Sequence, residues 1–455
     1  MMTAVIARHF AASVIYEPRL RLYREQDGRP AHRLAALLVR VTLWFVAAIC
    51  TMRSTMPNAT RAPRTRAPVR STFLPFSPPS IGDEEIAEVV NALRSDWITT
   101  GPKTKAFEQK FGTYLGAPGD TSLMLNSCTA GLHVALAVLG VGPGDEVVVP
   151  ALTFAATANV VEHLGARPVL VDVEPDTLCM DPIRVAEAIT AATRVIMPVH
   201  YAGHPADLDA MDALVGQHGI RVVEDAAHAA PTRYRGALIG SRSNFASFSF
   251  YATKNLTTAE GGALTGAPEL LEEARVLGLH GMSRDAWKRF DRGGSWEYDV
   301  IAPGFKYNMT DVQAAIGTHQ LDRLQGFHER RRFVATRYSE AFGQSDCLEV
   351  PTERDDASSS WHLYVLRLRT DRLRIGRNAF IEALTERNVG TSVHYRPLHM
   401  MSFYARKYGF VPEDFPVAAD AFSRMLSLPV HPRLSDDDVA DVIEAVLDLV
   451  EEHMV

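Results

Sequence analysis

One lysine stands in a setting that suits covalent chemistry with an aldehyde. The string SFYATK places Lys254 five residues after Ser249, and a glycine pair follows at 261–262. Upstream, the apolar run IRVVED ends in Asp225, and His228 comes three residues later. An amine that can form a Schiff base, a carboxylate that can keep a ring nitrogen protonated and a hydroxyl suited to a phosphate are the groups that bind pyridoxal phosphate (PLP). This spacing therefore predicts an enzyme that uses PLP.

Each of these side chains also has an ordinary structural interpretation. A lone lysine in a loop is mostly solvent-exposed, and Asp225 could instead cap a helix that begins at Ala226. His228 could lie against the cofactor ring or its O3 oxygen, or could be structural. The combination favours the cofactor, since burial beside Tyr251 would lower the pKa of the Lys254 amine and leave it able to attack an aldehyde.

A phosphate site and a stacking ring are found in two further segments. The string NSCTAGL, residues 126–132, opens a helix whose first backbone N–H groups can bind an anion. Thr129 adds a hydroxyl there, and Ser249 can add a second. Phe154, in PALTFAATAN, is suited to stack on the pyridine ring. Its alternative is plain core packing.

The chain from Phe73 onward alternates helical and strand patterns, which indicates an α/β protein. Helical stretches separate four short apolar runs, which are expected to be buried strands: 146–150, 167–173, 194–200 and 220–225. This alternation predicts a mostly parallel sheet covered on both faces. Ligands of such sheets bind at the carboxyl ends of the strands, where Phe154, His200 and Asp225 fall.

Two folded parts are expected after the N-terminal region. The large part, 73–325, begins with a helix over 81–95 whose apolar face contains Ile86, Val90 and Leu93. The segment 326–455 has a different character, with a long charged helix, one strand and an acidic amphipathic last helix. We expect it to be a smaller α/β domain.

Residues 1–72 differ from the rest in charge. Residues 1–70 hold 12 arginines against three acidic residues, about +9, so the remainder carries about −16 of the total of −7. An apolar run at 34–52 could be an anchor or part of a targeting sequence. Arg40 interrupts it, and an arginine inside a span costs about 3 kcal/mol. A disordered extension is the favoured interpretation, with membrane association the alternative.

Composition excludes several other classes. The four cysteines form no CxxC pair, which argues against a zinc knuckle or a disulfide framework and suits the cytoplasm. We expect no metal site, and the acidic body gives no footprint for nucleic acid. A dinucleotide-dependent oxidoreductase would need GxGxxG after a strand, whereas GVGPGDE precedes one.

Several strings together resemble one family: SFYATKNLTTAEGG, VVEDAAHA, PALTFAATAN, DWITTGPKTKAFE, PVHYAGHPADLDAM and PGFKYNMTDVQAAIG. They are similar to the DegT/DnrJ/EryC1/StrS nucleotide-sugar aminotransferases over about residues 73–455. Within that family the wording is nearest to the UDP-4-amino-4-deoxy-L-arabinose/oxoglutarate aminotransferase branch. The resemblance implies a fold type I, aspartate-aminotransferase-like homodimer with PLP.

The resemblance also assigns roles to residues. It places the cofactor lysine at Lys254 and the partner of the pyridine nitrogen at Asp225. The remaining cofactor contacts that it implies are Thr129, Ala130, Ser249, Phe154 and His228, together with Asn308 from the partner subunit. The family pattern differs here, since many members have Gly where this chain has Cys128 and GYNYRM where it has GFKYNM. That change makes Lys306 an alternative to Asn308.

The function implied is transfer of an amino group from glutamate, which becomes 2-oxoglutarate, to a keto-sugar nucleotide. A 4-keto UDP-pentose is favoured, for polysaccharide, lipopolysaccharide or antibiotic-sugar synthesis. Substrate contacts are expected from Thr100, His200, Tyr201, His394 and Arg396. The alternatives are a PLP-dependent sugar dehydratase, disfavoured because Lys254 is retained, and a non-catalytic binding or regulatory protein of the same fold.

Overall fold

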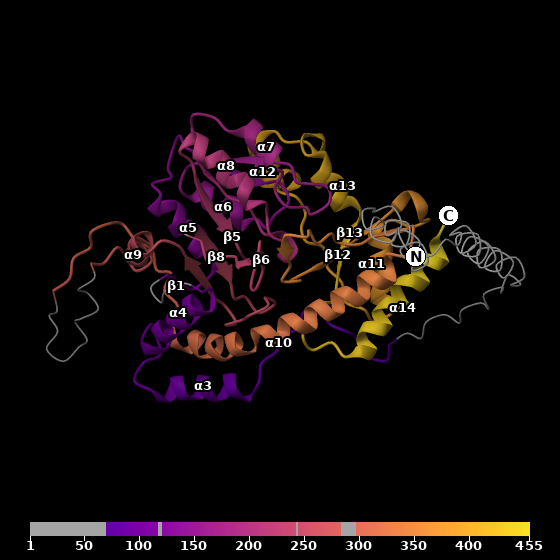
Figure 1. Ribbon diagram of the computed structural model, residues 1–455, viewed down its shortest axis with the longest axis horizontal. Coiled ribbons are helices and arrows are strands. Elements are labelled where there is room, and N and C mark those ends of the chain that lie inside the picture. The colour runs from indigo at the N-terminus through magenta and orange to yellow at the C-terminus, as the bar shows by residue number, and fades with distance from the viewer. Residues whose placement is uncertain (1–69, 117–120, 243, 284–296) are drawn as a thin grey trace, which may run out of the picture. The chain divides into compact units, whose positions relative to one another are not determined.

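The computed structural model describes residues 70–116, 121–242, 244–283 and 297–455. They belong to one compact unit, Arg66–Val455 (Figure 1). Most of the predicted extension, including the apolar run at 34–52, lies outside the described residues. At the start of the described chain, Arg70 donates a hydrogen bond of 2.6 Å to Asp438 in the last helix.

A seven-stranded sheet forms the centre of this unit, in the order β1-β9-β8-β5-β4-β2-β3. Only β9 runs against its neighbours, and the other pairings are parallel. The strands are β1 (Ser122–Leu125), β2 (Glu146–Pro150), β3 (Arg167–Val171), β4 (Thr193–Ile196), β5 (Arg221–Asp225), β8 (Phe245–Ser249) and β9 (Gly262–Thr265). The four apolar runs correspond to β2, β3, β4 and β5, so the predicted α/β fold with a mostly parallel sheet is confirmed.

Helices cover both faces of the sheet, and strand β2 shows why. Val147 and Val149 point into a core shared with α5 and α6, whereas Val148 points into a second core with α7 and α8. Alternate side chains of a strand face opposite layers, so a strand that is apolar throughout requires cover on both sides. The helices of this part are α3 (Asp83–Arg94), α4 (Pro102–Tyr114), α5 (Cys128–Val138), α6 (Ala156–His163), α7 (Pro182–Ala188), α8 (Leu208–His218) and α9 (Pro268–Leu277).

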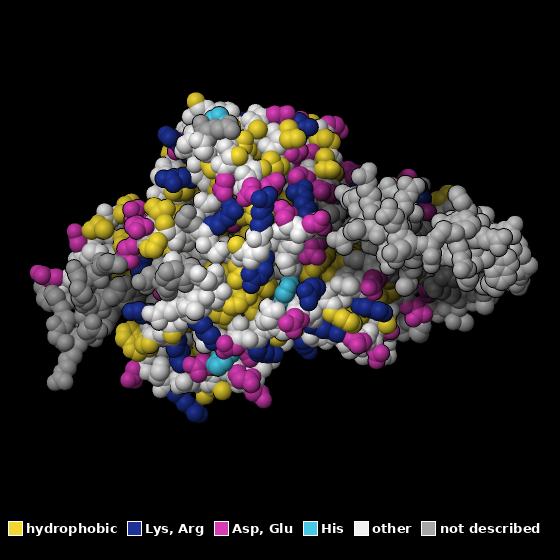
Figure 2. Space-filling view, viewed as in Figure 1, with side chains coloured by type: hydrophobic (Ala, Val, Ile, Leu, Met, Phe, Trp, Pro, Cys, Tyr) yellow, Lys and Arg dark blue, Asp and Glu magenta, His cyan; other side chains and the backbone are white. Residues whose placement is uncertain are grey.

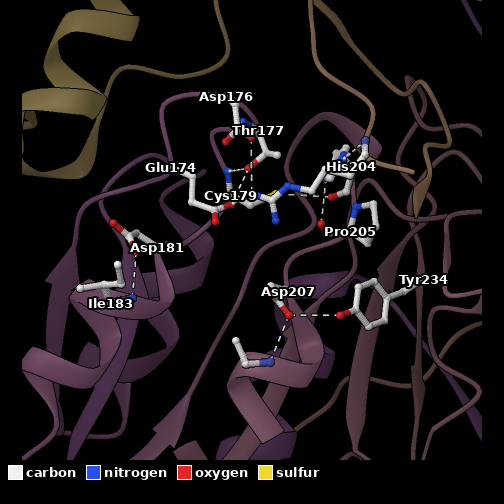
Figure 3. Close-up of polar contacts among 12 residues, drawn as sticks. Glu174, Asp176, Thr177, Cys179, Asp181, Ile183, His204, Pro205, Asp207 and Tyr234 are labelled. Carbon is white, nitrogen blue, oxygen red and sulfur yellow. Dashed lines mark hydrogen bonds and ion pairs between the residues drawn. The ribbon is translucent and has the colours of Figure 1, made fainter. Parts of the chain in front are cut away.

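Short polar side chains fix where α7 and α8 begin (Figure 3). Asp181 accepts a hydrogen bond from the Ile183 N–H at 2.8 Å at the start of α7. Asp207 accepts one from the Ala210 N–H at 3.0 Å and another from the Tyr234 hydroxyl at 3.1 Å. Both aspartates satisfy N–H groups that a helix start leaves free, so the two helices that cover this face are anchored at the ends nearest to the connecting loops.

Helix α10 (Asp311–Phe342) continues from the sheet into the C-terminal part, packing against α3 and α4 and farther along against α14 (Figure 1). The predicted boundary at 325/326 falls inside it. The C-terminal helices are α11 (Arg377–Glu386), α12 (Ser402–Tyr408), α13 (Pro416–Arg424) and α14 (Asp436–His453). A small sheet joins β10 (Leu348–Glu349), β12 (Tyr364–Leu368) and β13 (Met425–Leu428).

A second small sheet joins β11 (Ala357–Ser358), β6 (Arg233–Tyr234) and β7 (Ala237–Leu238). Strand β11, from the C-terminal part, therefore pairs with β6, and the residues after it donate backbone hydrogen bonds to Ala202 and Gly203. Short 3-10 turns complete the described elements: η1 (Tyr201–Gly203), η3 (Thr370–Arg372), η4 (Leu398–Met400) and η5 (Pro412–Asp414).

Gly262 lies where β9 meets the start of α5, and the space there has no room for a side chain. A Cβ at this position would lie 2.5 Å from the Cys128 backbone nitrogen and 2.6 Å from the Phe248 carbonyl oxygen. Since both obstacles are backbone atoms, we expect Gly262→Ala to lower the free energy of unfolding by about 2–3 kcal/mol, measured by chemical denaturation. The matched control is Gly142→Ala, whose Cβ would meet nothing within 4 Å. Equal stability of the two variants would contradict this prediction.

Candidate active site

A cavity of ≈ 370 Å³ lies beyond the carboxyl end of β5. Seven residues singled out by sequence line it: Thr129, Phe154, Asp225, His228, Ser249, Lys254 and His394. They come from α5, from loops after β2, β5 and β8, and from the C-terminal part. The cavity is therefore formed where distant segments meet at one end of the parallel strands, as expected for this sheet type.

Asp225 ends β5 with its side chain buried, at 4 % exposure. Its Oδ2 accepts a hydrogen bond of 2.8 Å from the Thr157 hydroxyl, and its Oδ1 accepts one of 3.2 Å from the Ala227 N–H. Burial raises the pKa of the Asp225 carboxyl, and the hydrogen bond from Thr157 opposes that effect. Neither oxygen is in an ion pair with a described side chain, so this carboxylate suits a cation brought in by a ligand.

Lys254 lies in the loop after β8, with its amine inside the same cavity. The backbone N–H of Lys254 donates to the Tyr251 carbonyl at 2.9 Å, which closes a tight turn behind the side chain. Its Nζ is 3.5 Å from His362 Nε2. Burial lowers the pKa of the Lys254 amine to about 8, against an upward effect of the Asp225 charge. A substantial share of the amine is thus neutral, and nucleophilic, near physiological pH.

The amino end of α5 opens toward this cavity. Ser127 caps the helix by accepting a hydrogen bond of 3.1 Å from the Ala130 N–H. Thr129 and Ser249, which both carry a hydroxyl, line the cavity. The N–H groups of the first turn have no carbonyl partner within the helix, and the helix dipole favours an anion there. Ala130, which the resemblance placed at the phosphate, is buried and does not line the cavity. Its N–H already donates to the Ser127 cap.

Two aromatic side chains, Phe154 and Tyr395, also line the cavity. Phe154 is 58 % exposed although it is a large apolar ring, and its centroid is 5.6 Å from that of Tyr395. The Tyr395 hydroxyl is 3.0 Å from His228 Nε2. Burial holds the pKa of His228 well below its usual value, so its ring is neutral. A flat ligand between these groups would have an exposed aromatic face to stack on.

Four of the five residues expected to contact substrate, all but His394, do not line the cavity. His200 is fully buried, with Nδ1 accepting the Ala206 N–H at 3.1 Å and Nε2 3.1 Å from Glu224. Tyr201 is 2 % exposed, and its hydroxyl donates to the His394 carbonyl. Both side chains join the segment before α8 to neighbouring segments, and their polar atoms are already engaged.

The other three residues expected to contact substrate, His394, Arg396 and Thr100, lie in three different settings. His394 lines the cavity, and its Nδ1 is 2.9 Å from the Ser427 hydroxyl. Arg396 is exposed two residues later. The Asn308 amide donates to the Thr100 hydroxyl at 2.6 Å, and neither residue lines the cavity of its own chain.

The sequence argument did not single out Thr157 or His362 as functional residues. Thr157 lies in the string PALTFAATAN, in which only Phe154 was given a role, and its hydroxyl reaches Asp225 across 68 positions. His362 lies 108 positions from Lys254. No local spacing relates such pairs, so their signal was absent from the chain as a string. Cys128 was noted only as a departure from the family, and its thiol donates to the Ser247 carbonyl at 3.2 Å.

These residues fit PLP. An unpaired buried carboxylate suits its ring nitrogen, a buried amine suits its aldehyde, and a helix start with two hydroxyls suits its phosphate. Among the described residues, no group of three or more His, Cys, Asp or Glu side chains is arranged to hold a metal ion.

Comparisons with known proteins agree with this class of site. The model of the DegT/DnrJ/EryC1/StrS aminotransferase family matches residues 79–447. The spore coat polysaccharide biosynthesis protein SpsC of Bacillus subtilis is 48% identical over 383 residues, which cover 84% of this chain and 98% of SpsC.

Solved structures match a similar share of the chain. The PLP form of Spr1654 from Streptococcus pneumoniae is 39% identical with a TM-score of 0.77, covering 84% of this chain and 99% of its own. The sugar aminotransferase CalS13 from Micromonospora echinospora is 30% identical with a TM-score of 0.74, covering 82% and 99%. The fold and site thus define a PLP-dependent aminotransferase, and the chain belongs to the DegT/DnrJ/EryC1/StrS aminotransferase family.

The remaining observations concern the distribution of charge on the surface and the hydropathy of the helices. On the face shown in Figure 2, basic and acidic side chains are intermixed, with apolar ones near the middle. Within the described ranges, no helix is long and apolar enough to cross a membrane.

The lowered pKa of Lys254 makes cofactor capture depend on pH. Since only the neutral amine attacks an aldehyde, we expect the rate at which the apo-protein captures PLP to rise with pH and to level off above about 8. Stopped-flow absorbance measures this rate. Asp225→Asn should move the midpoint to lower pH, because the carboxylate charge raises the pKa of Lys254. A rate that stays constant between about pH 6 and about pH 9 would contradict the prediction.

Proposed function

We propose that this enzyme transfers an amino group from glutamate to a keto group on a nucleotide-linked sugar, with a 4-keto UDP-pentose as the favoured acceptor. The names of two relatives support a sugar acceptor, since SpsC belongs to polysaccharide biosynthesis and CalS13 is a sugar aminotransferase. The product would serve the synthesis of a cell-surface polysaccharide, a lipopolysaccharide or an antibiotic sugar.

The observation that carries the proposal is the placement of Lys254 and Asp225 in one cavity. PLP, when bound, supplies an electron-withdrawing ring that weakens the bonds next to the transferred amine. Asp225, fixed by Thr157 and Ala227, would hold the ring nitrogen protonated. Thr129, Ser249 and the start of α5 would hold the phosphate.

Lys254 would also act as the proton carrier of the reaction. Its Nζ would take a proton from the carbon that bears the amino group of glutamate and return a proton on the other side of the nitrogen. A pKa of about 8 suits both roles, because such an amine gains and loses a proton readily near neutral pH. Retention of this lysine favours amine transfer over sugar dehydration.

The sugar nucleotide would enter past His394 and the exposed Arg396. Burial lowers the pKa of His394 to about 4, so its ring would be a neutral hydrogen-bond partner. The guanidinium group of Arg396 could form paired hydrogen bonds with a diphosphate. Thr100, His200 and Tyr201 already form hydrogen bonds with other protein groups. They would therefore hold neighbouring segments in place and would not contact the substrate directly.

The amine-transfer proposal is tested with PLP and glutamate. Wild-type protein should convert bound PLP to pyridoxamine phosphate, seen by absorbance, and borohydride reduction should fix PLP on the peptide that contains Lys254. Lys254→Ala should lose both signals, with activity lower by at least roughly 10³-fold. A panel of 4-keto and 3-keto nucleotide sugars, read by mass, then identifies the acceptor. Normal turnover by Lys254→Ala would overturn the proposal.

A homodimer is part of this proposal, and an uncovered apolar face supports it. Ile86, Val90 and Leu93 on α3 are 56 %, 38 % and 59 % exposed. Beside them is an apolar groove of ≈ 290 Å³ that Ala252 and Ala259 also line. These two residues belong to the loop that carries Lys254, so a second copy seated here would close the site from outside.

A shared site would also explain the position of Asn308. Its amide lies outside the cavity of its own chain, close to Thr100. In a dimer this amide would reach the phosphate in the partner subunit, and each cavity would be complete only when two chains are paired.

We expect Ile86→Asp to produce a monomer, because a charge on the uncovered face would be desolvated on pairing. The matched control is Ile183→Asp, since Ile183 is also exposed, at 67 %, but lies on α7. Light scattering reports the mass of each, and PLP titration reports the affinity, which should fall only in the Ile86 variant. Two dimeric variants would contradict the assignment of this face.

Two further features of organisation remain proposals. We place the boundary of a large cofactor domain and a small C-terminal domain at 325/326, within α10. We also propose a cytoplasmic enzyme, because keto-sugar nucleotides and glutamate are substrates of that compartment.

A further inference from the structure

His362 enters the cavity from a part of the chain that the sequence argument left aside. It precedes β12, lines the cavity next to Lys254 and is only 6 % exposed. Its Nε2 is 3.5 Å from the Lys254 Nζ, and no other side-chain hydrogen bond is recorded for that amine among the described residues. The question is what this nitrogen can offer to the amine.

The protonation of His362 follows from Asn255. The Asn255 Nδ2 donates to the Ser360 carbonyl at 2.9 Å, and a carbonyl can only accept, so the orientation of the amide is fixed. The amide oxygen then lies 3.1 Å from His362 Nδ1. Since that oxygen also only accepts, Nδ1 must carry the proton. A neutral ring in this tautomer presents a bare lone pair at Nε2.

The surroundings keep the ring neutral. Burial holds the pKa of His362 well below its usual value, and the positive charge of Lys254 lowers it further. The other titratable groups that face it are His228, with its ring centroid at 4.3 Å, Arg331 and His394. Each of them disfavours a second proton on the ring, so Nε2 remains a hydrogen-bond acceptor.

The backbone of His362 is also held in place. Arg331 is buried in α10, and its Nη1 donates to the Val430 carbonyl and, at 3.4 Å, to the carbonyls of Trp361 and His362. The Nε2 atom is thus fixed from two sides, by Asn255 through the ring and by Arg331 through the main chain.

We propose that His362 is a positioning residue for Lys254: its Nε2 accepts a hydrogen bond from the Nζ amine when that amine is released, and so turns the nitrogen lone pair toward the substrate carbon. The inference rests on the proposed role of Lys254 as the proton carrier. An amine held by one of its N–H bonds has its lone pair directed away from the acceptor, whereas a free amine rotates. Such orientation contributes to the rate without contributing to substrate binding.

Two variants test this proposal. His362→Leu replaces the acceptor by an apolar side chain of similar size. His362→Gln replaces the ring by an amide whose oxygen can still accept a hydrogen bond. We expect His362→Leu to lower the rate constant of the glutamate half-reaction at saturating glutamate by roughly 10- to 100-fold, with little change in the apparent Kd for glutamate. The isotope effect with α-deuterated glutamate should increase, because proton transfer becomes slower. His362→Gln should recover part of both.

A second readout uses the apo-protein and needs no turnover. Trace labelling with acetic anhydride, followed by mass spectrometry of the Lys254 peptide, gives the pH at which the amine loses its proton. Loss of an acceptor disfavours the ammonium, so the midpoint should fall by roughly one pH unit in His362→Leu and less in His362→Gln. A general loss of structure would not combine a more reactive amine with slower catalysis.

The proposal is overturned if His362→Leu leaves both the labelling midpoint and the isotope effect unchanged, or if His362→Gln is no better than His362→Leu. Failure of the amine-transfer proposal gives a different result. In that case borohydride would not fix PLP on the Lys254 peptide of the wild-type protein, whatever the His362 variants do.

Discussion

The structure of the site depends on the burial of a carboxylate and an amine in one cavity. Asp225 is 4 % exposed, and neither of its oxygens is in an ion pair with a described side chain. Burial of a carboxylate without an ion-pair partner is unfavourable, and a ligand cation would offset that cost. Burial also lowers the pKa of Lys254 to about 8, which makes its amine nucleophilic. The same removal of water thus prepares both groups for PLP.

The fold satisfies this constraint by placing the ends of several elements around the cavity. The parallel strands bring the end of β5 close to the start of α5. Gly262 in β9 lets the start of α5 approach the backbone of β9 and β8. Long helix α10 carries Arg331, which secures the segment containing His362. The C-terminal part therefore supplies one wall of the site as well as a second core.

The histidines in the cavity are neutral for a common physical reason. Burial lowers the pKa of His228, His362 and His394, and the nearby amine lowers each of them further. With three neutral rings, the charges that matter are those of Asp225, Lys254 and the bound substrates. In a poorly hydrated site such charges interact more strongly than they would in water.

The sequence by itself determined four of the seven central strands, β2, β3, β4 and β5, because they follow from local hydrophobic pattern. It also determined the setting of the cofactor lysine and the alternation of helix and strand, which depend on short spacing. It also placed an apolar face on the helix at 81–95, but only the tertiary structure shows that Ile86 and Leu93 stay uncovered within one chain. Likewise, the buried pair of His200 and Glu224 and the contact of His362 with Lys254 were decided by folding. Such contacts join residues that are far apart in the sequence. No local pattern relates these residues, because the geometry of the whole sheet and of α10 decides which side chains meet.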